Sequence, residues 1–201
     1  MTHHGRLTVL AVITAFNLVL APQYLFGGGG AVAAAPAESY VVDGACREGV
    51  AQGRYELRTS SGALRVTGAF NHGRRTGSFI FWEPSGARVA HIPYDDDARN
   101  GTLATWYEGA AKGAEPARRY ESTWRHGARD GPTRTWFRDG HRRTEADFAQ
   151  GALVTATAWS DAGAKLTDRT SREIVERDAN AADTHYADLE ALVQAHLPHC
   201  D

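Results

Sequence analysis

The sequence has little of what most catalytic and metal-binding proteins display. It has two cysteines in 201 residues and no nucleophile elbow, phosphate loop or zinc motif. Gly27–Gly30 lacks the following Lys-Ser/Thr of a phosphate loop. Asp95–Asp97 does not start a calcium loop, because Arg99 and Asn100 stand where that loop needs an oxygen ligand and a glycine. We therefore expect no enzyme activity, no metal and no cofactor.

The chain also lacks a large excess of charge of either sign. Its formal net charge is −2, which argues against a nucleic-acid partner bound through bulk charge. The two signs are unevenly distributed. Residues 46–168 carry 18 Lys and Arg against 15 Asp and Glu, whereas residues 169–201 carry 3 against 7. The acidic tail is therefore complementary to the rest of the chain, which favours docking between them.

The apolar run Thr8–Ala21 is short for a membrane span, which takes about 20 residues. It follows Arg6 and leads to small residues with Ala-x-Ala choices at Ala31–Ala33 and Ala35–Ala37. This order is typical of a secretory signal peptide, which we assign to residues 1–37. An uncleaved membrane anchor is the alternative. We expect a periplasmic or secreted protein that meets the membrane only through this segment before cleavage.

Glycine is abundant, with 21 residues, and much of it lies in one recurring frame. The frame is a bulky residue, two free positions, Gly, three free positions and Gly. Its copies are 24, 24, 30 and 24 residues apart, a period typical of stacked supersecondary units. The copies begin at Cys46, Phe70, Tyr94, Trp124 and Phe148, and their glycines are Gly49, Gly53, Gly73, Gly77, Gly101, Gly127, Gly131 and Gly151.

Between the frames lie short runs of aromatic and β-branched residues, such as Ser78–Trp82 and Thr133–Phe137. Ser-Gly or Asp-Gly pairs follow them, which is a β-hairpin pattern. Each unit is thus predicted to be a strand, a tight turn, a strand and a second turn built on the glycine frame. The glycines are expected to supply positive φ in these turns.

These units resemble MORN repeats, in the variant form widespread in bacterial proteins and often labelled YwqK-type antitoxins. The resemblance covers residues 46–166 and rests on the frame and on Trp82, Trp106 and Trp136, each five residues after a second glycine. The departures are Asp97 and Thr155 in place of glycines and Arg58 in place of an aromatic residue. The resemblance implies a mainly β fold, a single-layer antiparallel β-meander of about five hairpins over residues 38–168. It implies no particular activity, because the functions of the family are diverse.

The pattern changes in the tail, residues 169–201. Thr170–Glu173 has the S/T-x-x-E form of a helix capping box, and apolar residues then recur at helical spacing up to Pro198. Asn180 and Asp183 leave open whether this is one helix or two. A single-layer sheet needs a cover on one face, and this amphipathic tail is our candidate for it.

The aromatic residues offer two interpretations. Trp82, Trp106 and Trp136 are expected to form a row on one face of the sheet. They are either sheet core beneath the tail helix or a recognition strip flanked by arginines, a composition typical of binding hot spots. The flanking candidates are Arg74, Arg75, Arg118, Arg119, Arg142 and Arg143.

The two cysteines, Cys46 and Cys200, open the first frame and close the tail. Five hairpins at ~4.8 Å per strand would span roughly 48 Å, and a helix over residues 171–197 would span ~40 Å. A helix running back over the sheet would bring the two thiols together. We predict a Cys46–Cys200 disulfide, with two unpaired thiols and a detached tail as the alternative.

On these grounds the first hypothesis is an exported, non-catalytic module that binds another protein or a cell-envelope component. A toxin-neutralising or immunity protein is the second, and an envelope enzyme is the third. The sequence does not name the partner.

Overall fold

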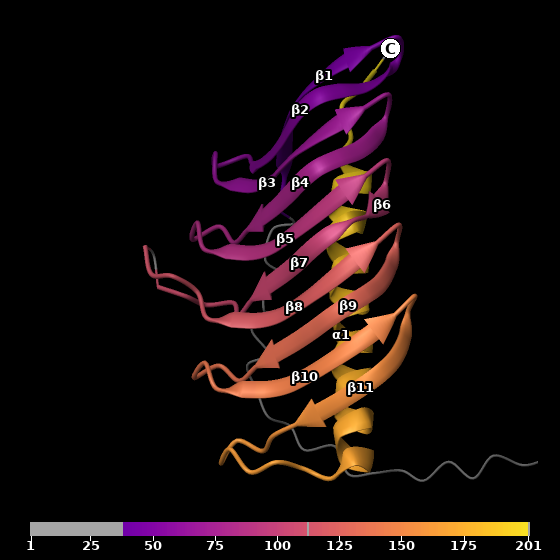
Figure 1. Cartoon of the computed structure of the whole chain (residues 1–201). Coiled ribbons are helices and arrows are strands. Elements are labelled where there is room, and N and C mark those ends of the chain that lie inside the picture. Colours follow the sequence, from indigo (N-terminus) through magenta and orange to yellow (C-terminus); the bar gives the residue numbers. More distant parts are fainter. Residues whose placement is uncertain (1–37, 112, 201) are drawn as a thin grey trace, which may run out of the picture. The chain divides into compact units, whose positions relative to one another are not determined.

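The computed structural model describes residues 38–111 and 113–200. The predicted signal segment, residues 1–37, lies outside the described residues. The described chain has the expected fold class: one open antiparallel β-meander with a single C-terminal helix packed against it (Figure 1).

The strands of the sheet follow the order of the chain, so each pairs with its neighbours in sequence. The two-residue strand β6 is the exception, because it pairs with β5 beside the main path. The strands are β1 (Tyr40–Arg47), β2 (Val50–Thr59), β3 (Leu64–Asn71), β4 (Arg74–Trp82), β5 (Arg88–Asp95), β6 (Ala98–Arg99), β7 (Gly101–Trp106), β8 (Arg118–Arg125), β9 (Ala128–Trp136), β10 (Arg142–Ala149) and β11 (Ala152–Ala158).

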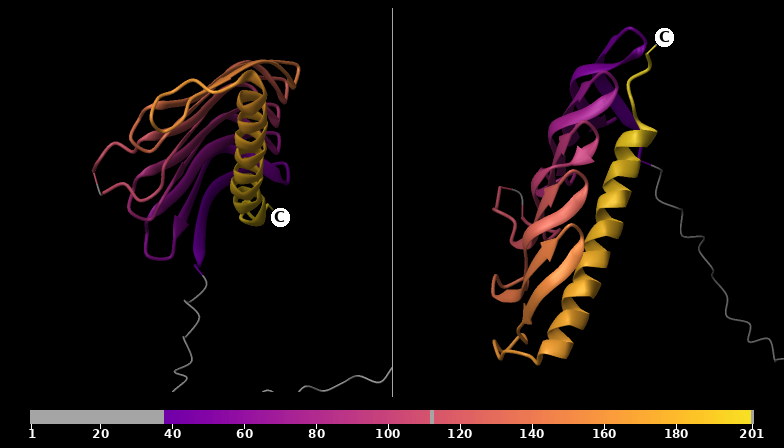
Figure 2. Two further views of the ribbon diagram at one scale, coloured as in Figure 1. Left: turned by 90° about the horizontal axis from the view of Figure 1, so that it is seen from below. Right: turned by 45° about the vertical axis from the view of Figure 1, so that its right-hand side comes forward.

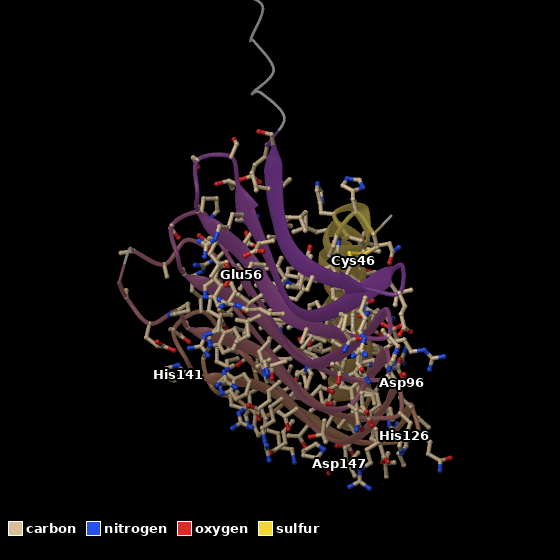
Figure 3. The ribbon with its side chains drawn as sticks, turned by 90° about the horizontal axis from the view of Figure 1, so that it is seen from above. Cys46, Glu56, Asp96, His126, His141 and Asp147 are labelled. Carbon is tan, nitrogen blue, oxygen red and sulfur yellow. A yellow bond between two sulfur atoms is a disulfide. The ribbon has the colours of Figure 1, made fainter. Side chains whose placement is uncertain are left out.

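The first glycine position of each frame, which Asp97 occupies in the third frame, lies in a two-residue turn at one end of the strands. Both central residues of these turns have positive φ, the type I′ geometry that matches the right-handed twist of the flanking strands. The pairs are Glu48–Gly49, His72–Gly73, Asp96–Asp97, His126–Gly127 and Gln150–Gly151. Figure 3 shows Asp96 and His126 at this end of the sheet and His141 at the other.

The second glycine of each frame stands opposite the aromatic residue that leads the next frame. The pairs are Gly53–Phe70, Gly77–Tyr94, Gly101–Trp124 and Gly131–Phe148. These glycines also have positive φ, and around Gly53 and Gly77 a Cβ would meet nothing within 4 Å. Backbone conformation, not crowding, therefore requires glycine at these two positions.

The tail forms one helix, α1 (Asp168–Ala195), of 28 residues. Its N-cap is Thr167, whose side chain accepts a hydrogen bond from the Thr170 N–H, so the cap predicted at Thr170 is wrong by three residues. The helix starts earlier because the Thr167 hydroxyl accepts this N–H group, as an N-cap side chain does. Ser171 Oγ accepts a hydrogen bond from the Ala158 N–H of β11 at 3.0 Å, which ties the first turn of the helix to the last strand.

The main core lies between the sheet and α1, which runs across the strands on one face (Figure 2). The lead residues of the frames form a buried row beneath it: Phe70, Tyr94, Trp124 and Phe148. Phe79 sits between two of them, edge-to-face with Phe70 at 5.6 Å and with Tyr94 at 5.4 Å. Such aromatic pairs add stability beyond the area they bury.

The predicted disulfide between Cys46 and Cys200 is present, with a Cα–Cα distance of 5.5 Å. Cys46 is labelled in Figure 3, beside the C-terminal end of the helix. Two other contacts hold the same segment: Tyr55 Oη donates to the His196 carbonyl at 2.9 Å, and Pro198 packs so close to Gly44 that a Cβ there would clash. The tail is thus fixed to the first hairpin both covalently and by packing.

Candidate binding surfaces

The acidic residues of α1 dock the helix on the sheet. Their carboxylates face arginines that rise from the strands, in the pairs Asp178–Arg143 at 2.8 Å, Asp183–Arg129 at 2.7 Å and Glu190–Arg99 at 2.9 Å. The charge complementarity expected between the tail and the rest of the chain is therefore realised in these contacts. Arg143, one of the candidate binding residues, is committed to this docking.

Glu190 is the most connected of these carboxylates. It accepts hydrogen bonds from Tyr94 Oη and Arg99 Nε, and Arg75 Nη1 lies 3.5 Å away. Burial would raise the pKa of Glu190, but the hydrogen bonds from Arg99 and Tyr94 outweigh it, so the pKa is lowered. Burial likewise opposes the charge of Arg99, yet its hydrogen bond to Glu190 leaves the Arg99 pKa raised. Both groups stay charged at neutral pH.

The three candidate tryptophans lie on the sheet face opposite α1. They end strands β4, β7 and β9: Trp82, Trp106 and Trp136. The residue before each lies on the helix side. Phe81 belongs to the core under α1, and Thr135 Oγ1 lies 3.4 Å from Asp178 Oδ2. Thr105 lines a cleft together with residues of α1. Successive side chains of a strand alternate between faces. The tryptophans are therefore not part of the core beneath the helix.

Each tryptophan pairs with an arginine that begins the next strand of the sheet path. The pairs are Trp82–Arg88, Trp106–Arg118 and Trp136–Arg142. The Arg118 guanidinium lies 5.1 Å from the centroid of Trp106 and 6.0 Å from that of Trp136. Arg142 lies 4.9 Å from Trp136, and Arg88 lies 4.7 Å from Trp106. We call these six residues the tryptophan–arginine ladder.

A β-bulge lies next to each pair, and after Arg118 and Arg142 it separates two arginines that are neighbours in sequence. Trp136 pairs with Arg142 and Thr135 with Thr144, which leaves Arg143 as the extra residue. Arg143 contacts Asp178 of α1, so it belongs to the helix side while Arg142 belongs to the ladder. Bulges of this kind redirect side chains at the rim of a sheet.

Arg74 and Arg75 lie outside the ladder, at the tight-turn end of β4. Arg74 pairs with Asp96, and Arg75 Nε lies 2.8 Å from Asp97 Oδ1. Of the six arginines expected to flank the tryptophans, only Arg118 and Arg142 therefore lie among them. Arg88 was missed, although a Trp-x5-Arg spacing at Trp82 and again at Trp136 would have indicated it.

A chain of ion pairs runs beside the ladder on the same face. Glu121 pairs with Arg118 and lies 3.7 Å from Arg134. Glu145 is 3.1 Å from Arg134 and 3.5 Å from Arg142. These partly exposed pairs contribute little to stability individually, and their main effect is to fix the directions of the guanidinium groups.

A cleft opens on the helix side, between the flank of α1 and the long-loop end of β7–β10. Its volume is about 450 Å³. We call it the arginine cleft, and its lining includes Thr105, Tyr107, Glu108, Arg119, Tyr120, Thr135, Trp136, Arg138, Arg143, Asp178 and His185. Burial, followed by the nearby charge of Arg119, lowers the pKa of His185.

One hydroxyl–imidazole pair exists in the described part of the chain. Ser78 Oγ lies 2.9 Å from His91 Nε2, and burial followed by the charge of Arg88 lowers the pKa of His91. No hydrogen bond joins a carboxylate to His91 among the described residues. An activated nucleophile needs a third group that orients its base, and the pair Ser78–His91 therefore does not form such a catalytic arrangement.

Residues 38–111 and 113–200 contain no group of three or more His, Cys, Asp or Glu side chains arranged to hold a metal ion. No helix in that same part of the chain is long and apolar enough to cross a membrane. In comparisons with known proteins, neither a protein-family model nor a curated protein matches the chain.

Proposed function

We propose that this chain is an exported, non-catalytic module of MORN-like repeats that binds an acidic protein partner through the sheet face opposite α1. The observation that carries the proposal is the tryptophan–arginine ladder on that face. Aromatic and arginine side chains supply most binding hot spots.

The residues of the ladder differ in how far they are exposed to solvent, and this indicates which of them can contact a partner. Trp106 is only 6% exposed, so its ring acts mainly as a support. The side chains of Arg88, Arg118 and Arg142 are 43%, 39% and 36% exposed and stand in a row. Each of these guanidinium groups has a glutamate within 4 Å, and partly exposed pairs of this kind are weak enough to exchange with the carboxylates of a partner. Stacking on the rings holds each guanidinium before a partner arrives, which lowers the entropic cost of binding.

Export rests on two independent features. The signal-like segment 1–37 predicts it, and the disulfide between Cys46 and Cys200 suits an oxidising compartment outside the cytoplasm. The MORN-like assignment rests on the glycine frame, whose copies share one turn geometry along the sheet.

In-cell cross-linking tests the proposal. A photo-reactive phenylalanine analogue replaces Arg134, on the ladder face, in one variant, and Arg177, on the exposed side of α1, in the other. We expect an acidic protein to be captured only from position 134, with capture falling as salt is raised. Combining Arg118→Gln and Arg142→Gln should abolish capture, whereas Arg74→Gln at the turn end should leave it intact.

Three outcomes would contradict the proposal: equal capture from both positions, capture that survives the double substitution, or an envelope polysaccharide in place of a protein. Circular dichroism of each variant confirms that the sheet is intact, so that loss of capture reports on the surface and not on unfolding.

A further inference from the structure

The arginine cleft is lined by more arginines than carboxylates. Arg119, Arg138 and Arg143 line it against two carboxylates, those of Glu108 and Asp178. Asp178 is occupied by Arg143, with Nε 2.8 Å from Oδ2. In the described part of the chain, neither Arg119 nor Arg138 forms an ion pair with a carboxylate. Two guanidinium groups thus face the cleft or its rim without a carboxylate in direct contact, and Glu108 is the one lining carboxylate that is left to balance them.

Tyr107 lies within cation–π distance of both of these guanidinium groups, and the nearer contact is with Arg138. The guanidinium of Arg138 lies 4.8 Å from the centroid of the Tyr107 ring, and that of Arg119 lies 5.9 Å from it. Tyr107 is held at its backbone and at the tip of its side chain. Its backbone N–H donates to the Ala117 carbonyl, and its hydroxyl donates to the Trp136 carbonyl at 2.8 Å. A hydrogen bond from Arg138 Nη1 to the Glu108 carbonyl at 3.0 Å completes the arrangement.

The remaining lining suits a polar ligand of small size. Thr105 and Thr135 form part of the wall on the sheet side, and His185 of α1 closes the opposite side. The volume of about 450 Å³ falls in the range of small-molecule sites. Planar guanidinium groups match the two oxygens of a carboxylate or a phosphate with paired hydrogen bonds.

We infer that the arginine cleft binds the oxyanion group of a small molecule, a carboxylate or a phosphate, between Arg119 and Arg138. The cleft lies on the helix side of the sheet and does not include the ladder arginines Arg88, Arg118 and Arg142, although Trp136 borders both. The bound anion places negative charge beside Arg119 and Arg138. His185 flanks it as a neutral hydrogen-bonding group.

His185 provides a direct readout of binding. Its ring faces Arg119 from β8, Glu108 from the loop after β7 and Asp188 from its own helix. An added anion in the cleft stabilises the protonated ring, so the pKa of His185 should rise on binding. A purely structural role for the two arginines would leave this pKa indifferent to added anions.

The experiment is an NMR titration of the histidine side chains in the full mature protein, with citrate and with inorganic phosphate separately, at constant ionic strength. We expect a saturable shift and a raised pKa at His185, with His72 and His126 in the distant turns as internal controls. Arg119→Gln and Arg138→Gln should each weaken binding by about tenfold or more, while Arg125→Gln should leave it unchanged. The probe that saturates at the lower concentration identifies the anionic group.

The inference is overturned if neither probe gives a saturable shift at His185. It is equally overturned if Arg125→Gln weakens binding as much as the cleft substitutions do, because the effect would then be one of bulk charge. Thermal unfolding of each variant separates a lost site from a lost fold.

Discussion

A left-handed backbone at the second position of each tight turn restricts which residues can stand there. Four of the five turns have glycine at this position, and Asp97 in the fifth adopts φ of 67°. Its side chain compensates, since Asp97 Oδ1 accepts hydrogen bonds from the Arg75 N–H at 2.9 Å and from Arg75 Nε at 2.8 Å. Asp and Asn tolerate this region better than other residues with a Cβ, so the departure from glycine keeps the turn.

Gly127 offers a direct test of this restriction. Its φ is 83° and a Cβ there would meet nothing within 4 Å, so substitution changes only the backbone strain. Gly127→Val should lower the free energy of unfolding by about 1–3 kcal/mol, because a β-branched residue is forced into the left-handed region. Gly127→Asn should cost clearly less. Urea unfolding of both variants is the measurement, and equal stability of the two would contradict the turn geometry.

Within the elements, charge fixes α1 to the sheet at three points along its length, through Asp178, Asp183 and Glu190. The 28-residue helix packs on a row of aromatic side chains, but apolar packing alone would permit sliding along that row. Directional pairs with Arg143, Arg129 and Arg99 select one register, each from a different strand.

The lowered pKa of Glu190 predicts how this docking depends on pH. A carboxyl group whose pKa is lower in the folded state stabilises the fold above its unfolded pKa, near 4.5, and that stability is lost as pH falls through the folded value. We expect the urea midpoint to fall as the pH is lowered below about 5. Glu190→Gln should reduce stability at pH 7 by about 1–3 kcal/mol and make the acid loss shallower.

Glu176→Gln serves as the matched control, because Glu176 is exposed on the same helix. It should follow the wild-type pH dependence. An identical pH profile for wild type and Glu190→Gln would show that Glu190 does not carry the acid sensitivity.

The sequence predicts the tight turns of the sheet but not its β-bulges, and the difference has a physical reason. The glycine frame marks the tight turns, because only a few residues accept positive φ, whereas the single-layer meander is what the resemblance to MORN repeats implies. The bulges after Trp106 and Trp136 leave no comparable mark, since any residue can occupy the extra position. The sequence therefore places Arg142 and Arg143 together, whereas the register sends one to the ladder and the other to α1.

At the scale of the whole molecule, two of the departures from the frame lie at the two edges of the sheet. Thr155, which replaces a second glycine, lies in the last strand, where no further aromatic residue stands opposite it. Cys46, which replaces a leading aromatic residue, lies in the first strand and joins the tail. Arg172 of α1 donates to the Val154 carbonyl on the open edge of β11 at 3.3 Å. The edges thus differ from the interior because they have one neighbour, and such features limit edge-to-edge association.

Export is a prediction for the whole chain. If residues 1–37 are a cleaved signal peptide, the mature protein should begin between Ala34 and Glu38, because the small residues there suit signal peptidase. N-terminal sequencing of protein from an envelope fraction measures this. Protein with an intact Met1 in the cytosol would contradict it.

The disulfide between Cys46 and Cys200 joins residues 154 positions apart, so it constrains almost the whole described chain in the unfolded state. By the loop-entropy relation it should contribute about 5 kcal/mol to the free energy of unfolding. The double variant Cys46→Ser with Cys200→Ser should lose a large part of this. It should still fold, because the ion pairs of α1 and the hydrogen bond from Tyr55 to His196 remain.

Hydrogen exchange locates the effect within the molecule. In the double variant, amides of residues 193–200 should exchange faster first, because this segment lies nearest the lost bond, while the first turns of α1 stay protected by the contact between Ser171 and Ala158. Wild-type protein treated with a reductant should reproduce the same pattern. Uniform loss of protection along α1 would show instead that the helix depends on the disulfide for its docking as a whole, and unchanged stability would show that the bond does not constrain the unfolded chain.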